Sequence, residues 1–396
     1  MKRVSVLGAT GSVGANTLEV LSRHRERFQV FALSASTRVD ALFQQIVRFK
    51  PRYAVMADAT QAGRLSDLVA AHALPTEVLG GAEAIEMIAS HPDTDIVMAA
   101  IVGVAGLPAC MAAARSGKRI LLANKEALVV AGELFLDAVK AGGATLLPID
   151  SEHSAIFQSL PEDASSWEHR VEKIILTASG GPFRSRDPAS FAAITADEAC
   201  AHPNWKMGRK ISVDSATMMN KALEVIEASY LFGLGPEQLQ VVIHPQSIVH
   251  SMVQYHDSSI IAQLGTTDMR VPIAYGLSWP DRIESGSERL DFHALQALTF
   301  ESMEEHRHPQ RFPGLRLAYQ ALRAPSGTCA VLNAANEVAV DAFLAGRLRF
   351  DQIHQLNLAT LEAIMPSRPG SLTDLLDLDR RTRAAALQRV AVLSRG

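Results

Sequence analysis

The chain has 396 residues, of which 48% are hydrophobic and 20% are charged, a composition that excludes an intrinsically disordered protein. Its 38 basic and 42 acidic side chains give a formal charge of −4, so it lacks the basic surplus of a nucleic-acid-binding protein. Three widely separated cysteines predict neither a disulfide framework nor a zinc site, as expected of a cytoplasmic protein.

Residues 1–149 alternate short apolar segments with helical patterns, for example at 16–24 and 125–140. The apolar segments resemble buried parallel strands. They are Val4–Leu7, Val30–Ser34, Tyr53–Met56, Ile96–Ala100, Arg119–Leu122 and Thr145–Pro148. The alternation predicts an α/β domain with a doubly wound, Rossmann-type parallel sheet. The uncharged stretch 96–114 fits this alternation as a strand, a loop and a helix, so we do not interpret it as a membrane span.

The pattern changes after residue 149. Strand patterns at 172–177, 240–243 and 260–264 lie among polar, glycine-containing motifs and predict an α+β catalytic domain over residues 150–285. The charged, histidine-rich segment 286–312 is predicted to be a linker. Only helical periods follow, at 315–322, 330–344, 350–364 and 372–393, so residues 313–396 are predicted to form a small helical domain.

The first strand runs into a glycine triplet, Gly8, Gly11 and Gly14, and then into a helix. Glycines let the backbone approach a pyrophosphate, and the N–H groups of the helix start bind its charge. The pattern indicates a dinucleotide site, and the alternative is a tight turn without a ligand. No carboxylate that would hold a ribose 2′-hydroxyl follows the second strand, where the chain reads Ser36-Thr37-Arg38. Hydroxyls beside a guanidinium suit a 2′-phosphate and favour NADPH, unless Arg38 is merely a solvated cation.

Polar side chains follow two later strands at the sheet edge where ligands bind in such folds. Asn124, Lys125 and Glu126 follow one strand and could position a nicotinamide and a substrate, or Asn124 could simply cap a helix. After the next strand, Asp150 and Glu152 would face the same way in extended backbone, while His153 would point away and act in support. Two such carboxylates suit Mg²⁺ or Mn²⁺. The alternative is a helix start capped by Ser151 with acidic residues in its first turn.

A second acidic candidate lies on a predicted helix. Asn220, Lys221 and Glu224 share one face, so Glu224 could be the third carboxylate, with Glu227 as its competitor. Ser215, Asn220 and Lys221 would then bind a phosphate, whereas the alternative is a surface Lys–Glu pair.

Two loops complete the predicted site. The segment 177–183 exposes backbone N–H groups and the Ser179 hydroxyl, which suits an oxyanion. The segment 202–210 places Trp205 and Met207 between helix breakers, as in a lid that closes over a ligand, or as ordinary packing.

The chain resembles the 1-deoxy-D-xylulose 5-phosphate reductoisomerase family in a series of motifs that covers nearly its whole length. In order they are GATGSVG, LANKE, PIDSEHSA, TASGGPF, HPNWKMGRKISVDSATMMNKALEVIEA, HPQSIVHSM, DMRVPIAYGLSWP and LNAANEVAV. The resemblance implies a cytoplasmic, NADPH-dependent homodimer of the non-mevalonate isoprenoid pathway that requires Mg²⁺, Mn²⁺ or Co²⁺. The family rearranges 1-deoxy-D-xylulose 5-phosphate and reduces it to 2-C-methyl-D-erythritol 4-phosphate.

The resemblance also implies roles for individual residues. The metal ligands would be Asp150, Glu152 and Glu224. The substrate's phosphate would be bound by Ser179, Ser215, Asn220 and Lys221. The reacting carbons would be surrounded by Lys125, Ser151, Glu152 and His202. NADPH would contact Thr10, Gly11, Ser12, Val13, Asn124, Glu126 and Gly208, with Trp205 and Met207 on a closing loop.

Two departures from the family pattern stand out. Ser36-Thr37-Arg38 occupies the place of a common Gly-Lys-Asn, and Ala222 that of a glycine. Two other functions remain as alternatives. A semialdehyde-type dehydrogenase would need a nucleophilic cysteine, for which Cys200 near His202 is the candidate. The other alternative is a non-catalytic NADPH-binding module, which would not require the acidic, serine and lysine residues of the predicted metal and phosphate sites.

Overall fold

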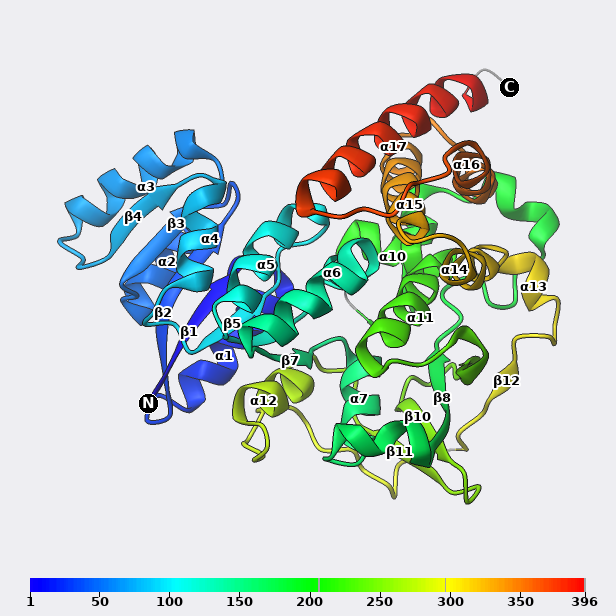
Figure 1. Ribbon diagram of the computed structural model, residues 1–396, viewed down its shortest axis with the longest axis horizontal. Helices are drawn as coiled ribbons and strands as arrows, with labels where there is room; N and C mark the ends of the chain where they lie inside the picture. Colours follow the sequence, from blue (N-terminus) through cyan, green and yellow to red (C-terminus); the bar gives the residue numbers. More distant parts are fainter. Residues whose placement is uncertain (206, 296, 395–396) are drawn as a thin grey trace. The chain divides into compact units, whose positions relative to one another are not determined.

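The structure is a computed structural model that describes residues 1–205, 207–295 and 297–394. The chain forms two compact units, each labelled by its elements in Figure 1. Unit 1 comprises Met1–Ala127, Phe135–Ser154 and Asp268–Glu288. Unit 2 comprises Leu128–Leu134, Ala155–Thr267 and Arg289–Gly396. The functional division at residues 149, 285 and 312 stays a prediction.

Unit 1 contains a seven-stranded sheet in the order β4-β3-β2-β1-β5-β6-β7, and every neighbouring pair is parallel. The strands are β1 Lys2–Leu7, β2 Phe28–Ala35, β3 Tyr53–Met56, β4 Glu77–Gly80, β5 Ile96–Ala99, β6 Arg119–Leu122 and β7 Thr145–Pro148. The predicted Rossmann-type sheet is therefore confirmed. The strand order reverses at β1, which has β2 on one side and β5 on the other, and ligands bind at such a switch point.

Helices connect these strands. They are α1 Ser12–Arg23, α2 Val39–Phe49, α3 Ala59–Ala71, α4 Ala82–Ser90, α5 Leu107–Arg115 and α6 Glu126–Gly142, whose middle residues belong to unit 2. Helix α7, Ser151–Ser159, leads from β7 into unit 2, and α12, Arg270–Ser278, comes later in the chain and packs against α1, β6 and β7. The uncharged stretch 96–114 forms β5, a short 3₁₀ turn and α5, as predicted. Among the described residues, no helix is both long and apolar enough to cross a membrane.

Unit 2 is built on a five-stranded sheet in the order β11-β10-β8-β9-β12, in which only the β8–β9 pair is parallel. The strands are β8 Val171–Ala178, β9 Leu239–Ile243, β10 Val249–Tyr255, β11 Ile260–Leu264 and β12 Glu301–Ser302. Helix α11, Met219–Phe232, packs against this sheet with most of its residues buried, the apolar ones in a single core. The predicted linker contributes strand β12 to the edge of this sheet. The sequence did not indicate this strand, because two residues are too few to show a periodic pattern.

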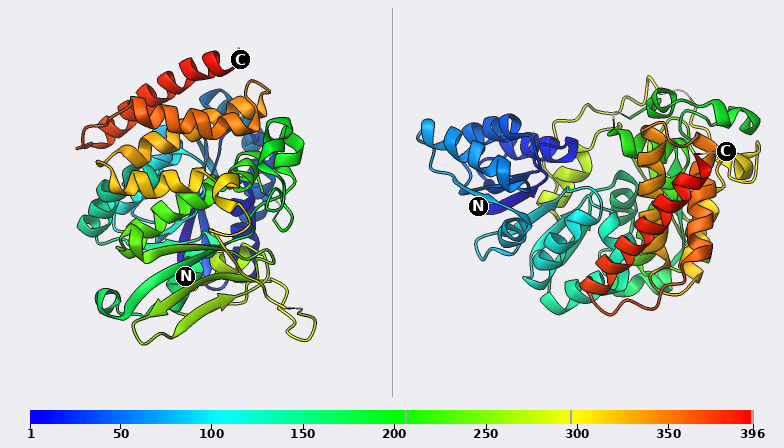
Figure 2. Two further views of the ribbon diagram at one scale, coloured as in Figure 1. Left: turned by 90° about the vertical axis from the view of Figure 1, so that its right-hand side faces the viewer. Right: turned by 90° about the horizontal axis from the view of Figure 1, so that it is seen from above.

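A second apolar core of unit 2 is formed largely by helices near the C-terminus, although the first of these helices, Gly314–Arg323, packs into the first core. The C-terminal helices are α14 Gly314–Arg323, α15 Thr328–Leu344, α16 Phe350–Ala363 and α17 Leu372–Leu393, close to their predicted bounds. Helix α15 packs against both α16 and α17, as the two views of Figure 2 show. Helix α10, Arg209–Ala216, joins this core through Val213 and Ala216. The C-terminal helices therefore support the helix that carries Ser215.

Candidate functional site

The glycine triplet forms a tight turn between β1 and α1. Gly8 has φ +80°, and a Cβ there would lie 2.6 Å from the Ala100 carbonyl oxygen. A Cβ at Gly14 would lie 2.4 Å from the Gly8 oxygen, whereas one at Gly11 would have its nearest neighbour at 3.3 Å. Gly11 is the N-cap of α1 and leaves the first N–H groups of the helix without a side-chain cap. This geometry suits an anion held by backbone N–H groups.

Arg38 links the second strand to this turn. Its Nη1 donates a hydrogen bond to the Thr10 carbonyl at 3.2 Å, and Ser36, Thr37 and Arg38 are all exposed beside it. The nearest acidic residue, Asp40, instead pairs with Arg64 on α3. The two predicted nucleotide segments therefore meet, and a guanidinium rather than a carboxylate lies at the end of β2.

Asn124 lies in the loop between β6 and α6. Its amide donates to the Gly103 carbonyl at 3.1 Å and accepts from the Ala127 N–H at 3.3 Å. This buried side chain thus joins the loop after β5 to the start of α6. Its bond from the Ala127 N–H agrees with the alternative that Asn124 caps the helix. Glu126 is buried in the first turn of α6, so the loop is held rigidly at the sheet edge where ligands bind.

Lys125 and Asp150 form an ion pair at the same edge, with Nζ 2.5 Å from Oδ2 and side chains only 12% and 18% exposed. Asp150 also accepts a hydrogen bond from the Ser151 N–H at 3.0 Å. Ser151 Oγ in turn donates to Glu152 Oε2 at 2.5 Å. These contacts bring four predicted site residues together directly after β6 and β7.

The prediction of extended backbone at Asp150–Glu152 is wrong, because α7 begins at Ser151. Asp150 lies immediately before the helix, and its carbonyl accepts the Ser154 N–H. Oxygen atoms of Asp150 and Glu152 nevertheless approach within 4.8 Å of each other. The prediction that His153 points away is also wrong, since a ring nitrogen of His153 lies within 4.8 Å of Asp150. Residues three apart share a face in a helix but not in a strand.

Helix α11 positions the acidic candidates of unit 2. The Asn220 amide and the Lys221 ammonium both donate to the Glu224 carboxylate. Lys221 and Glu224 are 4% and 1% exposed, so the alternative of a surface ion pair is wrong. Glu227 is also fully buried one turn later, so burial alone does not choose between the two acids.

The loop after β8 presents a hydroxyl donor. Gly180 and Gly181 have φ +81° and +62°, and the Gly181 N–H donates to Ser179 Oγ at 3.1 Å. His202 Nδ1 accepts the N–H groups of Asn204 and Trp205 at 3.1 and 3.0 Å, so the ring proton of a neutral His202 lies on Nε2. Nε2 then donates to Ser179 Oγ at 2.9 Å. Because Ser179 Oγ accepts twice, its own proton is left for a ligand.

The predicted lid lies between this loop and α10. The Trp205 ring centroid is 6.3 Å from that of His250, and Gly208 is the N-cap of α10. Lys206 is outside the described residues. Closure of the loop over a ligand therefore stays a prediction.

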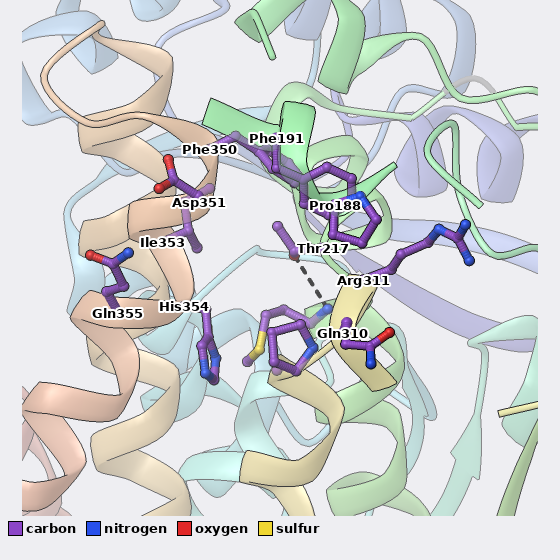
Figure 3. A pocket seen from close by; sticks show the side chains of 13 residues that line it. Pro188, Phe191, Thr217, Gln310, Arg311, Phe350, Asp351, Ile353, His354 and Gln355 are labelled. Carbon is purple, nitrogen blue, oxygen red and sulfur yellow. Dashed lines mark hydrogen bonds between the residues drawn. The ribbon is translucent and has the colours of Figure 1, made fainter. Parts of the chain in front are cut away.

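A cavity of about 200 Å³ opens in unit 2 between the segment around Thr217 and the start of α16 (Figure 3). Its wall is mainly apolar and includes Phe191, Phe350 and Ile353, with Thr217 and Met219 joined by a hydrogen bond at its base. None of its 13 lining residues belongs to the predicted site. The cavity is therefore distinct from the acidic and glycine-rich segments described above.

Three family models match the chain in sequence order. They are 1-deoxy-D-xylulose 5-phosphate reductoisomerase over residues 4–132, its C-terminal domain over residues 146–232, and the DXP reductoisomerase C-terminal domain over residues 264–385. The chain is 55% identical over 391 residues to the 1-deoxy-D-xylulose 5-phosphate reductoisomerase of Ralstonia nicotianae, a match that covers 99% of this chain and 98% of the relative.

Two solved structures are similar over nearly their whole lengths. A DOX-P reductoisomerase in complex with NADPH, fosmidomycin and magnesium is 43% identical, with a TM-score of 0.95 and all of both chains covered. The 1-deoxy-D-xylulose 5-phosphate reductoisomerase of Zymomonas mobilis in complex with NADPH is 44% identical, with a TM-score of 0.91 and coverage of 98% and 99%.

Proposed function

The chain belongs to the 1-deoxy-D-xylulose 5-phosphate reductoisomerase family, and we propose how its own residues carry out the reaction of that family. It is an NADPH-dependent, metal-using enzyme that rearranges 1-deoxy-D-xylulose 5-phosphate and reduces the product to 2-C-methyl-D-erythritol 4-phosphate. The observation that carries our assignment of the catalytic centre is the group formed by Lys125, Asp150, Ser151 and Glu152 at the carboxyl edge of the parallel sheet.

In our proposal the metal is held by Asp150 and Glu152 of unit 1 and by Glu224 of unit 2. Three carboxylates form an oxygen donor set that suits Mg²⁺ or Mn²⁺, and Asp150 and Glu152 have oxygens close enough to bind one cation together. A divalent ion bound there polarises a carbonyl oxygen as a Lewis acid. The Lys125 ammonium reduces the repulsion between the acidic groups, and we expect His153 to orient Asp150.

We assign the substrate's phosphate to donors of unit 2. The free proton of Ser179, the Ser215 hydroxyl, the Asn220 amide and the Lys221 ammonium would supply hydrogen bonds and charge. His202 would keep Ser179 oriented as a donor and lie near the reacting carbons. Because the phosphate does not react, its binding energy serves to orient the other end of the substrate.

We assign NADPH to the glycine turn and to the sheet edge of unit 1. The pyrophosphate would lie on the backbone of Thr10–Val13, and Ser36, Thr37 and Arg38 would bind the 2′-phosphate. Asn124 and Glu126, held at the start of α6, would face the nicotinamide half. Gly208 of unit 2, with Trp205 and Met207 on the predicted lid, would complete the enclosure that keeps water out.

We propose further that the enzyme is a cytoplasmic homodimer. Strand β11 is an edge strand of the sheet in unit 2, and its Ile260 and Ile261 are 52% and 49% exposed. An exposed, apolar edge strand is a template for pairing with a second copy. We expect light scattering to give the mass of a dimer for the native chain and the mass of a monomer for Ile261→Lys. The control is Ile85→Val, a change in the core of unit 1, which should remain dimeric.

The deciding experiment is an NADPH oxidation assay with deoxyxylulose phosphate, in native enzyme and in enzyme treated with EDTA. We expect turnover that EDTA abolishes and added Mg²⁺ or Mn²⁺ restores. Turnover that survives EDTA would remove the metal from the mechanism. The thioester route through Cys200 predicts instead no NADPH oxidation with this ketose, but reduction of NADP⁺ by a semialdehyde. NADPH binding without turnover under any metal would favour the non-catalytic module.

A further inference from the structure

Three helices of unit 2 are joined by a buried chain of polar side chains. The Asn357 amide on α16 donates to Asn336 Oδ1 on α15 at 3.0 Å. The Asn336 amide donates in turn to Asp214 Oδ1 on α10 at 2.7 Å, and Lys210 Nζ lies 3.0 Å from Asp214 Oδ2. Both asparagines are fully buried, and Asp214 is 1% exposed. The chain thus runs from the C-terminal helices to the helix that carries Ser215.

The surroundings of this chain are apolar. Val213, Ala216, Ala335 and Ala339, which are neighbours of Asp214 and Asn336 in sequence or within one turn, belong to the same hydrophobic core. A carboxylate in such a core is costly unless hydrogen bonds and a counter-charge satisfy it. Hydrogen bonds to a buried charge are directional and among the stronger ones in proteins. These hydrogen bonds therefore determine the rotational orientation of α10 about its axis. Apolar packing alone would allow a wider range of orientations.

The rotation of α10 matters because Ser215 follows Asp214 directly. Successive side chains of a helix point about 100° apart, so anchoring Asp214 toward α15 also fixes the direction of Ser215. The backbone at Ser215 is tightly packed as well, since a Cβ on Gly181 would lie 2.8 Å from the Ser215 carbonyl oxygen. A small rotation of α10 would thus disturb both Ser215 and the Ser179–Gly181 loop, which are the phosphate donors of two separate segments.

We propose that Asn336 is a positioning residue for the substrate's phosphate: through Asp214 it sets the orientation of α10 and hence of Ser215. The inference rests on the proposed function, in which Ser215 binds that phosphate. Asn336 touches neither substrate nor cofactor in this scheme, and it acts on the affinity for the substrate more than on NADPH binding, most of whose contacts we assign to unit 1.

The test compares Asn336→Leu with Asn333→Leu. Asn333 is an equally buried asparagine of α15, one turn earlier, whose amide bonds Glu337 at 3.3 Å and not α10. We expect Asn336→Leu to raise the KM for deoxyxylulose phosphate about tenfold, which corresponds to the loss of a hydrogen bond to a charged group, with smaller changes in kcat and in the Kd for NADPH. Asn333→Leu should lower the thermal midpoint to a similar degree but leave this KM within about twofold of the native value.

A second pair of variants keeps the test decisive if Asn336→Leu does not fold. Asn336→Asp places a carboxylate against Asp214 and should raise KM, whereas adding Asp214→Asn to it restores a donor–acceptor pair and should return KM toward native. Equal KM values for Asn336→Leu and Asn333→Leu, or no recovery in the double variant, would overturn the inference. Ser215→Ala separates the two claims: if it leaves KM unchanged, the phosphate assignment itself fails; if it raises KM while Asn336→Leu does not, only the positioning role fails.

Discussion

Alanine at Gly11 and alanine at Gly14 should have opposite consequences, although both glycines belong to the same turn. A Cβ at Gly14 would lie 2.4 Å from the Gly8 oxygen and 2.6 Å from the Ala9 Cα, both backbone atoms that cannot move aside as a side chain would. Overpacking of this kind costs about 1–3 kcal/mol. Gly11 has φ −77° and ψ 173°, which alanine adopts readily, and its single contact is at 3.3 Å. Gly11→Ala loses a favourable N-cap residue, but alanine also lowers the conformational entropy of the unfolded chain. The free energy of unfolding should therefore change by less than about 1 kcal/mol.

Gly11→Ala should impair nucleotide binding although it leaves the free energy of unfolding nearly unchanged. Its Cβ would project where we place the pyrophosphate, so we expect Gly11→Ala to weaken NADPH binding at least about tenfold while folding normally. Fluorescence titration with NADPH and urea unfolding measure the two quantities on the same samples. Gly63→Ala is the control, because a Cβ at this helical position meets nothing within 4 Å and should only stabilise α3. Native affinity in Gly11→Ala, or equal destabilisation by Gly11→Ala and Gly14→Ala, would refute our interpretation of the turn.

Four further outcomes are expected. Arg38→Ala should raise the KM for NADPH with little change in kcat; an unaltered KM would leave Arg38 a surface cation that only bonds the turn. Glu224→Gln should lower kcat strongly while NADPH still binds, and unchanged turnover would exclude Glu224 as a metal ligand. Burial lowers the pKa of His244, so the unfolded chain binds this proton more readily, and the free energy of unfolding should fall as pH drops below about 6.5. His244→Asn should flatten that dependence in urea unfolding at pH 7.5 and 5.5. Burial raises the pKa of the Cys110 thiol to about 12, so iodoacetamide should label Cys200 first, and Cys200→Ser should stay active unless a thioester forms.

The parallel sheet was predictable because its strands are buried on both faces and therefore read as continuous apolar runs. Strands β3 and β5 have every residue buried, and both were found from the sequence. Strand β4, Glu77–Gly80, was missed because it lies at the sheet edge with no buried residue, so no apolar pattern marks it. Strand β12 escaped for a similar reason, since two paired residues cannot produce a period.

The backbone of the acidic segment was predicted wrongly, because α7 begins at Ser151. The residue types of Asp150 and Glu152 indicate a cation site in a strand or in a helix, so our proposal of these two residues as ligands does not depend on the conformation. The place of His153 did depend on it, and only the helix brings it toward Asp150. The tautomer of His202 and the contact between Asp214 and Asn336 lay beyond prediction, because both depend on hydrogen bonds between residues that the chain brings together only on folding.

The two departures from the family pattern are accommodated by the fold in different ways. Arg38 lies in place of the family's Gly-Lys-Asn segment yet keeps a cation beside the glycine turn, where it bonds the Thr10 carbonyl. Ala222 is fully buried in the core of unit 2 among Leu223 and Ile226, so its methyl group adds packing and favours the helix. Asn220 and Lys221 each donate to the Glu224 carboxylate on α11 in the presence of that methyl group. We therefore expect both departures to leave the activity intact, because one preserves a positive charge and the other affects only packing.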